Sequence, residues 1–176
     1  MVWNKIMARC AGLLMACTLM LTACTVSYKF NGSSIDYTKI KTISFENFPN
    51  RSQAFVWGPM ESMFNTALQD IFMSQTSLSS NKRNGDLQFS GEIINYDAFN
   101  KGVGSDGFST MVELRMTVRV NFVNTVNPKE SFENRQFTAS REYESSKQLS
   151  AVQDELVNQM IKEIVDQIFN ASVANW

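Results

Sequence analysis

The sequence contains no histidine, and its three cysteines, at positions 10, 17 and 24, all lie in the first 24 of 176 residues. The rest of the chain therefore lacks imidazole and thiol groups, which excludes histidine bases, catalytic triads, thiolate metal ligands and disulfides there. It also lacks a glycine-rich phosphate loop and a nucleophile elbow. Carboxylate chemistry stays formally open, but the acids are scattered, so an enzyme is the weakest functional interpretation, and no metal or cofactor is expected.

Long apolar runs are equally scarce. The first segment carries only Lys5 and Arg9 as charges and then runs uncharged from Cys10 to Cys24. A basic start followed by a short apolar run is typical of a secretory signal, and this run is shorter than the roughly 20 residues that a membrane span requires. No later segment reaches that length, so the sequence predicts no membrane-spanning helix.

The apolar run ends in Leu21-Thr22-Ala23-Cys24, an aliphatic residue, two small residues and a cysteine. This pattern is a lipobox, which predicts that residues 1–23 are a lipoprotein signal peptide cleaved between Ala23 and Cys24. Cys24 would then carry a covalent diacylglycerol and an N-acyl lipid such as palmitate, and more than one chain gives stable membrane attachment. The alternative is an ordinary signal peptide that ends in a chance cysteine.

The charge after cleavage is mildly acidic. Without Lys5 and Arg9 the chain keeps 14 basic and 17 acidic side chains, a net charge of −3. That balance argues against nucleic acid as a partner. We expect the lipidated cysteine and a polar tether over residues 24–38, followed by one domain over residues 39–176, a size that suits a single core.

Alternation of apolar and polar residues predicts four strands. The expected ranges are 40–48, 87–99, 108–124 and 131–143. The clearest is the third, in which the residues at even positions from 108 to 122, all apolar except Thr110, lie on one face. Those at odd positions, all polar except Met111, lie on the other, as in an antiparallel strand with one wet face. A turn over residues 81–86 precedes the second strand, and a glycine-rich hairpin loop over residues 100–107 follows it.

Apolar residues at helical spacing predict two helices. One spans residues 59–75, with Pro59 at its first position. The other runs from Ser150 to about Phe169, where Ser150 and Gln153 have the spacing of a capping box. The resulting order, β-α-β-β-β-α, predicts an α+β fold in which both helices pack on one face of a four-stranded, mainly antiparallel sheet. The other face would present Glu113, Arg115, Thr117 and Arg119 to water or to a partner.

Several segments in this order resemble the lipopolysaccharide-assembly lipoprotein family LptE, in its Bacteroidetes-type form. The matching segments are residues 41–50 (KTISFENFPN), 84–93 (NGDLQFSGEI), 149–156 (LSAVQDEL), 166–170 (DQIFN) and 175–176 (NW). The resemblance covers nearly the whole chain after the lipobox and implies two helices on a four-stranded sheet, in agreement with the pattern analysis.

The resemblance also implies a function. An LptE protein plugs the large outer-membrane β-barrel LptD, helps to assemble it, and takes part in lipopolysaccharide transport to the outer leaflet. The chain would then be a non-enzymatic lipoprotein of the cell envelope, anchored in the outer membrane and facing the periplasm and the barrel lumen. The alternative is a free-standing periplasmic lipoprotein that binds another ligand or envelope protein.

Lipopolysaccharide carries phosphates, which cations hold through charge-assisted hydrogen bonds. The candidate contacts with lipopolysaccharide or with the barrel are two cations in the 81–86 turn, one in the glycine-rich loop and two on the wet strand face: Lys82, Arg83, Lys101, Arg115 and Arg119. Arg115 and Arg119 lie four residues apart on a strand, roughly 13 Å. The alternative for all five is that they are ordinary solvated charges.

Overall fold

The computed structural model describes residues 35–53, 57–103 and 109–173. The chain divides into two units, residues 1–31 and 32–176, and every described element belongs to the second unit. In chain order the elements are β1 (Thr42–Phe45), α2 (Met60–Gln75), β2 (Ser79–Ser80), β3 (Leu87–Val103), β4 (Ser109–Asn124), the 3₁₀ helix η2 (Pro128–Glu130), β5 (Phe132–Glu144) and α3 (Leu149–Ser172). The predicted residues Ala23 and Cys24 lie outside the described residues.

The sheet has five strands in the order β2-β1-β3-β4-β5. β1 runs parallel to β2 and β3, whereas β3, β4 and β5 are successively antiparallel. The prediction of a four-stranded, mainly antiparallel sheet is therefore wrong in strand number, and the sheet is mixed. The missing strand is β2, whose two residues, Ser79 and Ser80, show no apolar alternation. Helix α2 lies between β1 and β2 in the chain and supplies the crossover that these parallel strands require.

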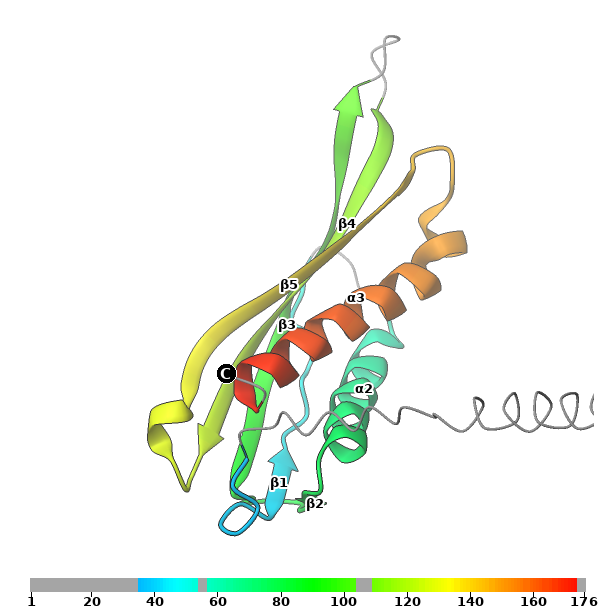
Figure 1. The fold of residues 1–176 in the computed structure, drawn as a ribbon. Helices are drawn as coiled ribbons and strands as arrows, with labels where there is room; N and C mark the ends of the chain where they lie inside the picture. The colour runs from blue at the N-terminus through cyan, green and yellow to red at the C-terminus, as the bar shows by residue number, and fades with distance from the viewer. Residues whose placement is uncertain (1–34, 54–56, 104–108, 174–176) are drawn as a thin grey trace, which may run out of the picture. The chain divides into compact units, whose positions relative to one another are not determined.

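Both helices cover the same face of this sheet, as predicted (Figure 1). Phe72 of α2 connects the layers, because its ring centroid lies 4.8 Å from that of Phe89 on β3 and 5.1 Å from that of Phe169 on α3. The buried residues of α3 recur at helical spacing along one side of the helix: Val157, Met160, Ile161, Ile164, Val165, Ile168 and Phe169. The core thus fills the space between one sheet face and the helix pair.

Strand β4 confirms the alternation that the sequence predicts. Its fully buried residues, facing the helices, are Leu114, Met116, Val118, Val120 and Phe122. Polar residues occupy the positions between them, and Thr117 is also buried because Thr138 on β5 covers it, with 3.0 Å between the two hydroxyl oxygens. Strand β3 continues to Val103, beyond the predicted end at residue 99, so Asn100 and Lys101 are strand residues and not part of a loop.

At Gly91, strand β3 lies too close to its neighbours for a side chain. A Cβ atom there would lie 2.1 Å from the carbonyl oxygen of Arg119 and 2.5 Å from Cε1 of Phe48. The Phe48 ring fills this space and reaches Phe64 of α2, with 5.4 Å between ring centroids. The missing side chain at Gly91 therefore lets the segment after β1 pack into the core.

The start of α3 differs from the prediction. The helix begins at Leu149, Gln148 is the N-cap, and no side chain caps it. The predicted capping box of Ser150 and Gln153 is therefore wrong, because the Gln153 amide is used elsewhere: its Nε2 donates to the hydroxyl of the buried Tyr96, at 2.8 Å. Burial raises the pKa of Tyr96, and this hydrogen bond satisfies its hydroxyl inside the core.

Candidate functional site

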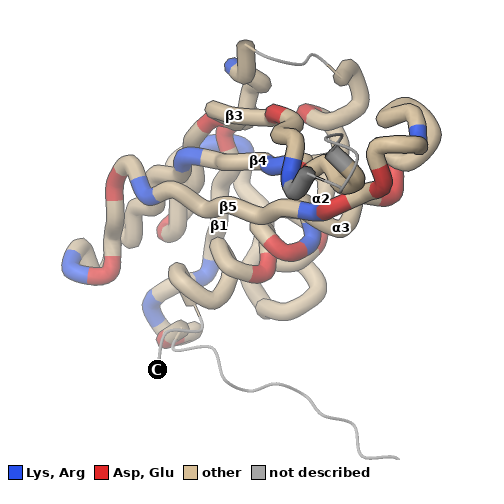
Figure 2. The backbone as a smooth tube through the Cα atoms, turned by 90° about the horizontal axis from the view of Figure 1, so that it is seen from above, with Lys and Arg blue, Asp and Glu red and all other residues tan. Residues whose placement is uncertain are grey.

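The sheet face opposite the helices carries three of the five predicted cations. Arg115 and Arg119 lie on β4, and Lys101 lies on β3 opposite Met111 of β4. Basic and acidic residues interleave along β3, β4 and β5 (Figure 2). The cross-strand register places five carboxylates on this open face: Glu92, Asp97, Glu113, Glu142 and Glu144. The open face is therefore mixed in charge and not a basic patch.

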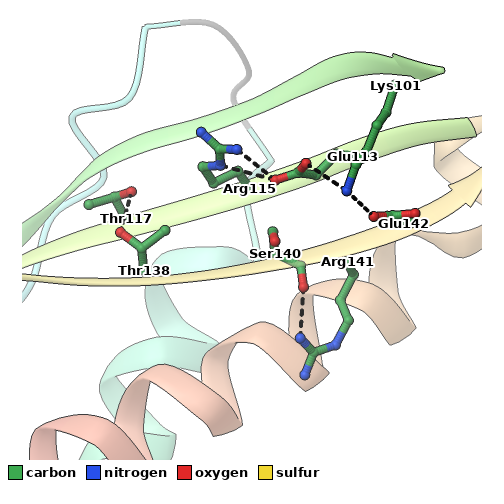
Figure 3. Close-up of polar contacts among 8 residues, drawn as sticks. All are labelled: Lys101, Glu113, Arg115, Thr117, Thr138, Ser140, Arg141 and Glu142. Carbon is green, nitrogen blue, oxygen red and sulfur yellow. Dashed lines mark hydrogen bonds and ion pairs between the residues drawn. The ribbon is translucent and has the colours of Figure 1, made fainter.

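Lys101, Glu113, Arg115 and Glu142 form one network across β3, β4 and β5 (Figure 3). Glu113 accepts hydrogen bonds from Nη2 of Arg115 at 2.7 Å and from its Nε at 3.2 Å, and its other oxygen lies 3.6 Å from Nζ of Lys101. Lys101 also donates to Glu142. The hydrogen bond from Arg115 is the main reason why the pKa of Glu113 is lowered, and the contact with Glu142 raises the pKa of Lys101.

Two more contacts hold the arginines on this face. The guanidinium carbon of Arg115 lies 5.1 Å from the ring centroid of Phe99, a partly exposed aromatic residue on β3. Nη1 of Arg119, on β4, lies 3.2 Å from Oε1 of Glu92 on the neighbouring strand β3. Partly exposed pairs of this kind contribute at most about 1 kcal/mol each. Their main effect is to limit the freedom of both arginines to bind phosphate, and Glu92 also neutralises Arg119.

Lys82 and Arg83 are placed differently. They belong to the loop between β2 and β3, are exposed, and have no ion pair within the part of the chain that the structure describes. Both line a depression of about 480 Å³ at the ends of β1 and β4 and the start of β3. The rest of the lining is mostly amide and hydroxyl side chains with one acid and three apolar residues: Ser44, Phe45, Glu46, Asn47, Asn84, Gln88, Phe89, Ser90 and Val123.

The loop that carries these two cations packs closely against β1 at Gly85 and is attached to it at Asp86. Asn84 adopts a positive φ of 56°, and a Cβ atom on Gly85 would lie 2.7 Å from backbone atoms of Ile43 and Ser44. The carboxylate of Asp86 accepts hydrogen bonds from the backbone N–H groups of Lys41 and Thr42, at 2.8 and 2.9 Å. These bonds lower the pKa of Asp86 and attach the loop to the start of β1.

The five predicted cations therefore do not converge on one site. Lys82 and Arg83 precede the start of β3, whereas Lys101 lies near its other end, separated by about 45 Å of extended strand. Arg115 and Arg119 lie between them on β4. Sequence reasoning missed the carboxylates that pair with three of these cations, because cross-strand neighbours depend on a register that the pattern alone does not give.

The described residues contain no cluster of three or more His, Cys, Asp or Glu side chains that could hold a metal ion. Among the same residues, no helix is long and apolar enough to cross a membrane. The arrangement as described offers binding surfaces, namely a charge-paired sheet face and a polar depression with two cations.

Comparison with known proteins identifies the family. The family model for LptE, described as lipopolysaccharide-assembly, matches residues 40–172, which is most of the chain. The chain belongs to the LptE family. The match covers every element from β1 to the end of α3, and it confirms the resemblance found in the sequence. No curated protein matches this LptE-family chain.

Solved structures share the fold of this LptE-family chain at low sequence identity. The rare lipoprotein B from Shewanella oneidensis is 12% identical, with a TM-score of 0.52 over 74% of this chain and 92% of that chain. A hypothetical protein from Chlamydia trachomatis is 11% identical, with a TM-score of 0.52 over 77% of this chain and 99% of that chain. An uncharacterised lipoprotein B from Nitrosomonas europaea is 12% identical, with a TM-score of 0.50 over 73% and 79%.

Proposed function

We propose that this chain is an outer-membrane lipoprotein that plugs and helps to assemble an LptD-type β-barrel and takes part in lipopolysaccharide transport to the outer leaflet. Its membership of the lipopolysaccharide-assembly family over residues 40–172 carries the proposal. The lipobox supports the anchor: Cys24 would hold the protein to the membrane from the periplasmic side through its diacylglycerol and N-acyl chains. The family is non-enzymatic, so the role is one of binding and assembly.

The open sheet face supports the plug. The interior of a membrane barrel is polar, so a plug should present a polar surface. The charged groups of that surface should pair with one another, without a large excess of one charge. The face of β3, β4 and β5 meets this requirement, because Arg115 and Lys101 share Glu113 and Arg119 pairs with Glu92. We assign Lys101, Arg115 and Arg119 to barrel contact on this basis.

The depression beside β1 and β3 supports contact with lipopolysaccharide. Lys82 and Arg83 can offer charge-assisted hydrogen bonds to phosphate, and the surrounding amides and hydroxyls suit sugar hydroxyls. Because the lining is mostly polar, we assign it the phosphorylated carbohydrate head and not the acyl chains.

Affinity purification of the lipidated chain from detergent-solubilised outer membranes tests the plug. The proposal predicts that a large β-barrel protein co-purifies with it. Recovery of the chain alone, while it still binds lipopolysaccharide, would instead favour the free-standing periplasmic lipoprotein.

Charge reversal tests the lipopolysaccharide contact. Lys82→Glu with Arg83→Glu should weaken lipopolysaccharide binding by the detergent-solubilised chain about tenfold or more, since one charge-assisted hydrogen bond contributes about 1.5–3 kcal/mol. Lys129→Glu with Lys162→Glu makes the same change in net charge elsewhere and serves as the control. Equal losses in both variants would show that net charge, and not the depression, governs binding.

A further inference from the structure

Strand β5 forms one edge of the sheet, and it is long for an edge strand, with 13 residues. An edge strand of this length presents unpaired backbone groups that can accept a strand from another chain. Natural proteins block such edges with charged or inward-pointing side chains, with bulges, or with a covering helix.

The free side of β5 can be identified from its hydrogen bonds. The carbonyl oxygen of Thr138 accepts from Nε2 of Gln167 on α3, at 3.3 Å, and that of Ser140 accepts from Nη1 of Arg141, at 2.7 Å. Alternate residues of an antiparallel strand direct their backbone groups to the same side. The backbone groups of Gln136, Thr138 and Ser140 therefore point away from β4.

Arg141 is held in place by α3. Its Nη1 also donates to Glu163 at 2.7 Å, and its Nε donates to the side-chain oxygen of Gln159 at 3.1 Å. Gln159, Glu163 and Gln167 follow one another at intervals of four residues, so they form one stripe along α3 that runs beside β5. Arg141 occupies the helix-facing side of β5, the side of the buried residues Phe137 and Ala139. Figure 3 shows the contact of its guanidinium with Ser140.

A second blocking feature lies toward the start of β5. Asn134 adopts a positive φ of 52°, and the register of β4 with β5 shifts between Val120 and Phe122. A strand with this irregularity cannot extend a regular ladder past residue 134. The edge is thus interrupted at one end by the bulge and closed in the middle by side chains.

We propose that Arg141 and the α3 stripe Gln159–Glu163–Gln167 form an edge guard, which keeps β5 from pairing with β5 of a second copy of this chain. The second copy fits because two identical antiparallel edges complement each other through the same backbone groups, in a two-fold contact. The guard satisfies the carbonyl groups of Thr138 and Ser140, and it fills the space that an added strand would need. This role is separate from the barrel and lipopolysaccharide contacts proposed above.

The test is the oligomeric state of the full chain in non-ionic detergent. Arg141→Ala with Gln167→Ala removes the guard, and the protein mass should rise about twofold as the concentration increases, while the parent chain stays monomeric. Arg51→Ala with Gln69→Ala makes the same chemical changes away from β5 and should leave the chain monomeric.

A photo-crosslinking residue distinguishes strand pairing from general aggregation. Placed at Gln136 on β5 of the unguarded variant, it should link two copies, whereas at Gln69 on α2 it should not. An unguarded variant that stays monomeric with a parent-like circular dichroism spectrum would overturn the proposal. Equal crosslinking from both positions would overturn it too, because the association would then arise from unfolding.

Discussion

Replacement of Gly91 by alanine tests the packing on which the sheet and its open face depend. The added Cβ would lie 2.1 Å from the Arg119 carbonyl oxygen and 2.5 Å from the Phe48 ring, both far inside ordinary contact distance. One of these neighbours is backbone, and the Phe48 ring is wedged against Phe64, so neither can move aside cheaply. Overpacking a core costs about 1–3 kcal/mol, and two such contacts place this variant near 3 kcal/mol.

Urea unfolding, monitored by far-UV circular dichroism, measures the loss in free energy of unfolding. With a denaturant slope of about 2 kcal/mol/M, the midpoint for Gly91→Ala should fall by about 1.5 M. Gly58→Ala is the matched control, because nothing lies within 4 Å of the Cβ that it adds. Its free energy of unfolding should stay within about 0.5 kcal/mol of the parent value. If Gly91→Ala also unfolds at the parent midpoint, the close approach of β3 to Phe48 and Arg119 is refuted.

Three further predictions concern the core, the loop anchor and the lipid. Phe72→Ala should lower the free energy of unfolding by about 3–5 kcal/mol, because the ring is fully buried against β3 and α3; a loss under about 1 kcal/mol would contradict this packing. Asp86 has a lowered pKa in the folded state, so its contribution is present above its unfolded pKa of about 3.9 and is lost as the pH falls through the folded value. Urea unfolding should therefore show Asp86→Asn less stable than the parent at pH 7, with the difference shrinking below about pH 4. Cys24→Ser should abolish metabolic labelling with palmitate, and label retained by the variant would argue against the lipobox.

Much of the fold follows from periodicity. The even-numbered residues of β4 from Leu114 to Phe122 are buried as the alternation predicts, and both helices bury their apolar stripes. Burial of one face per element is a local property, so the sequence of each element is sufficient to predict it. Strand β2 was not predicted, because Ser79 and Ser80 pair through backbone groups and have no apolar side chain that would indicate a strand.

The candidate site is less predictable because it depends on contacts between strands. The pairing of Lys101 with Glu142 joins residues 41 apart in the chain, and it neutralises a cation that was predicted as a contact with lipopolysaccharide or the barrel. Arg141 interrupts the apolar alternation of Phe137, Ala139 and Tyr143, and this interruption is the one sequence signal of the edge guard. A polar residue in an apolar series indicates a specific partner, but only the packing of α3 identifies Glu163 and Gln159 as that partner.

In the proposed function, the open face of β3, β4 and β5 lies against a barrel wall. Photo-crosslinking in intact cells tests it most directly, with the crosslinker placed at Asn121 on the open face of β4. We expect a covalent adduct with a large outer-membrane β-barrel protein, identified by mass spectrometry. The adduct should disappear when Arg115→Glu and Arg119→Glu are combined in a chain that still folds. The absence of a barrel adduct from Asn121, in cells that export lipopolysaccharide normally, would contradict contact between this face and the barrel.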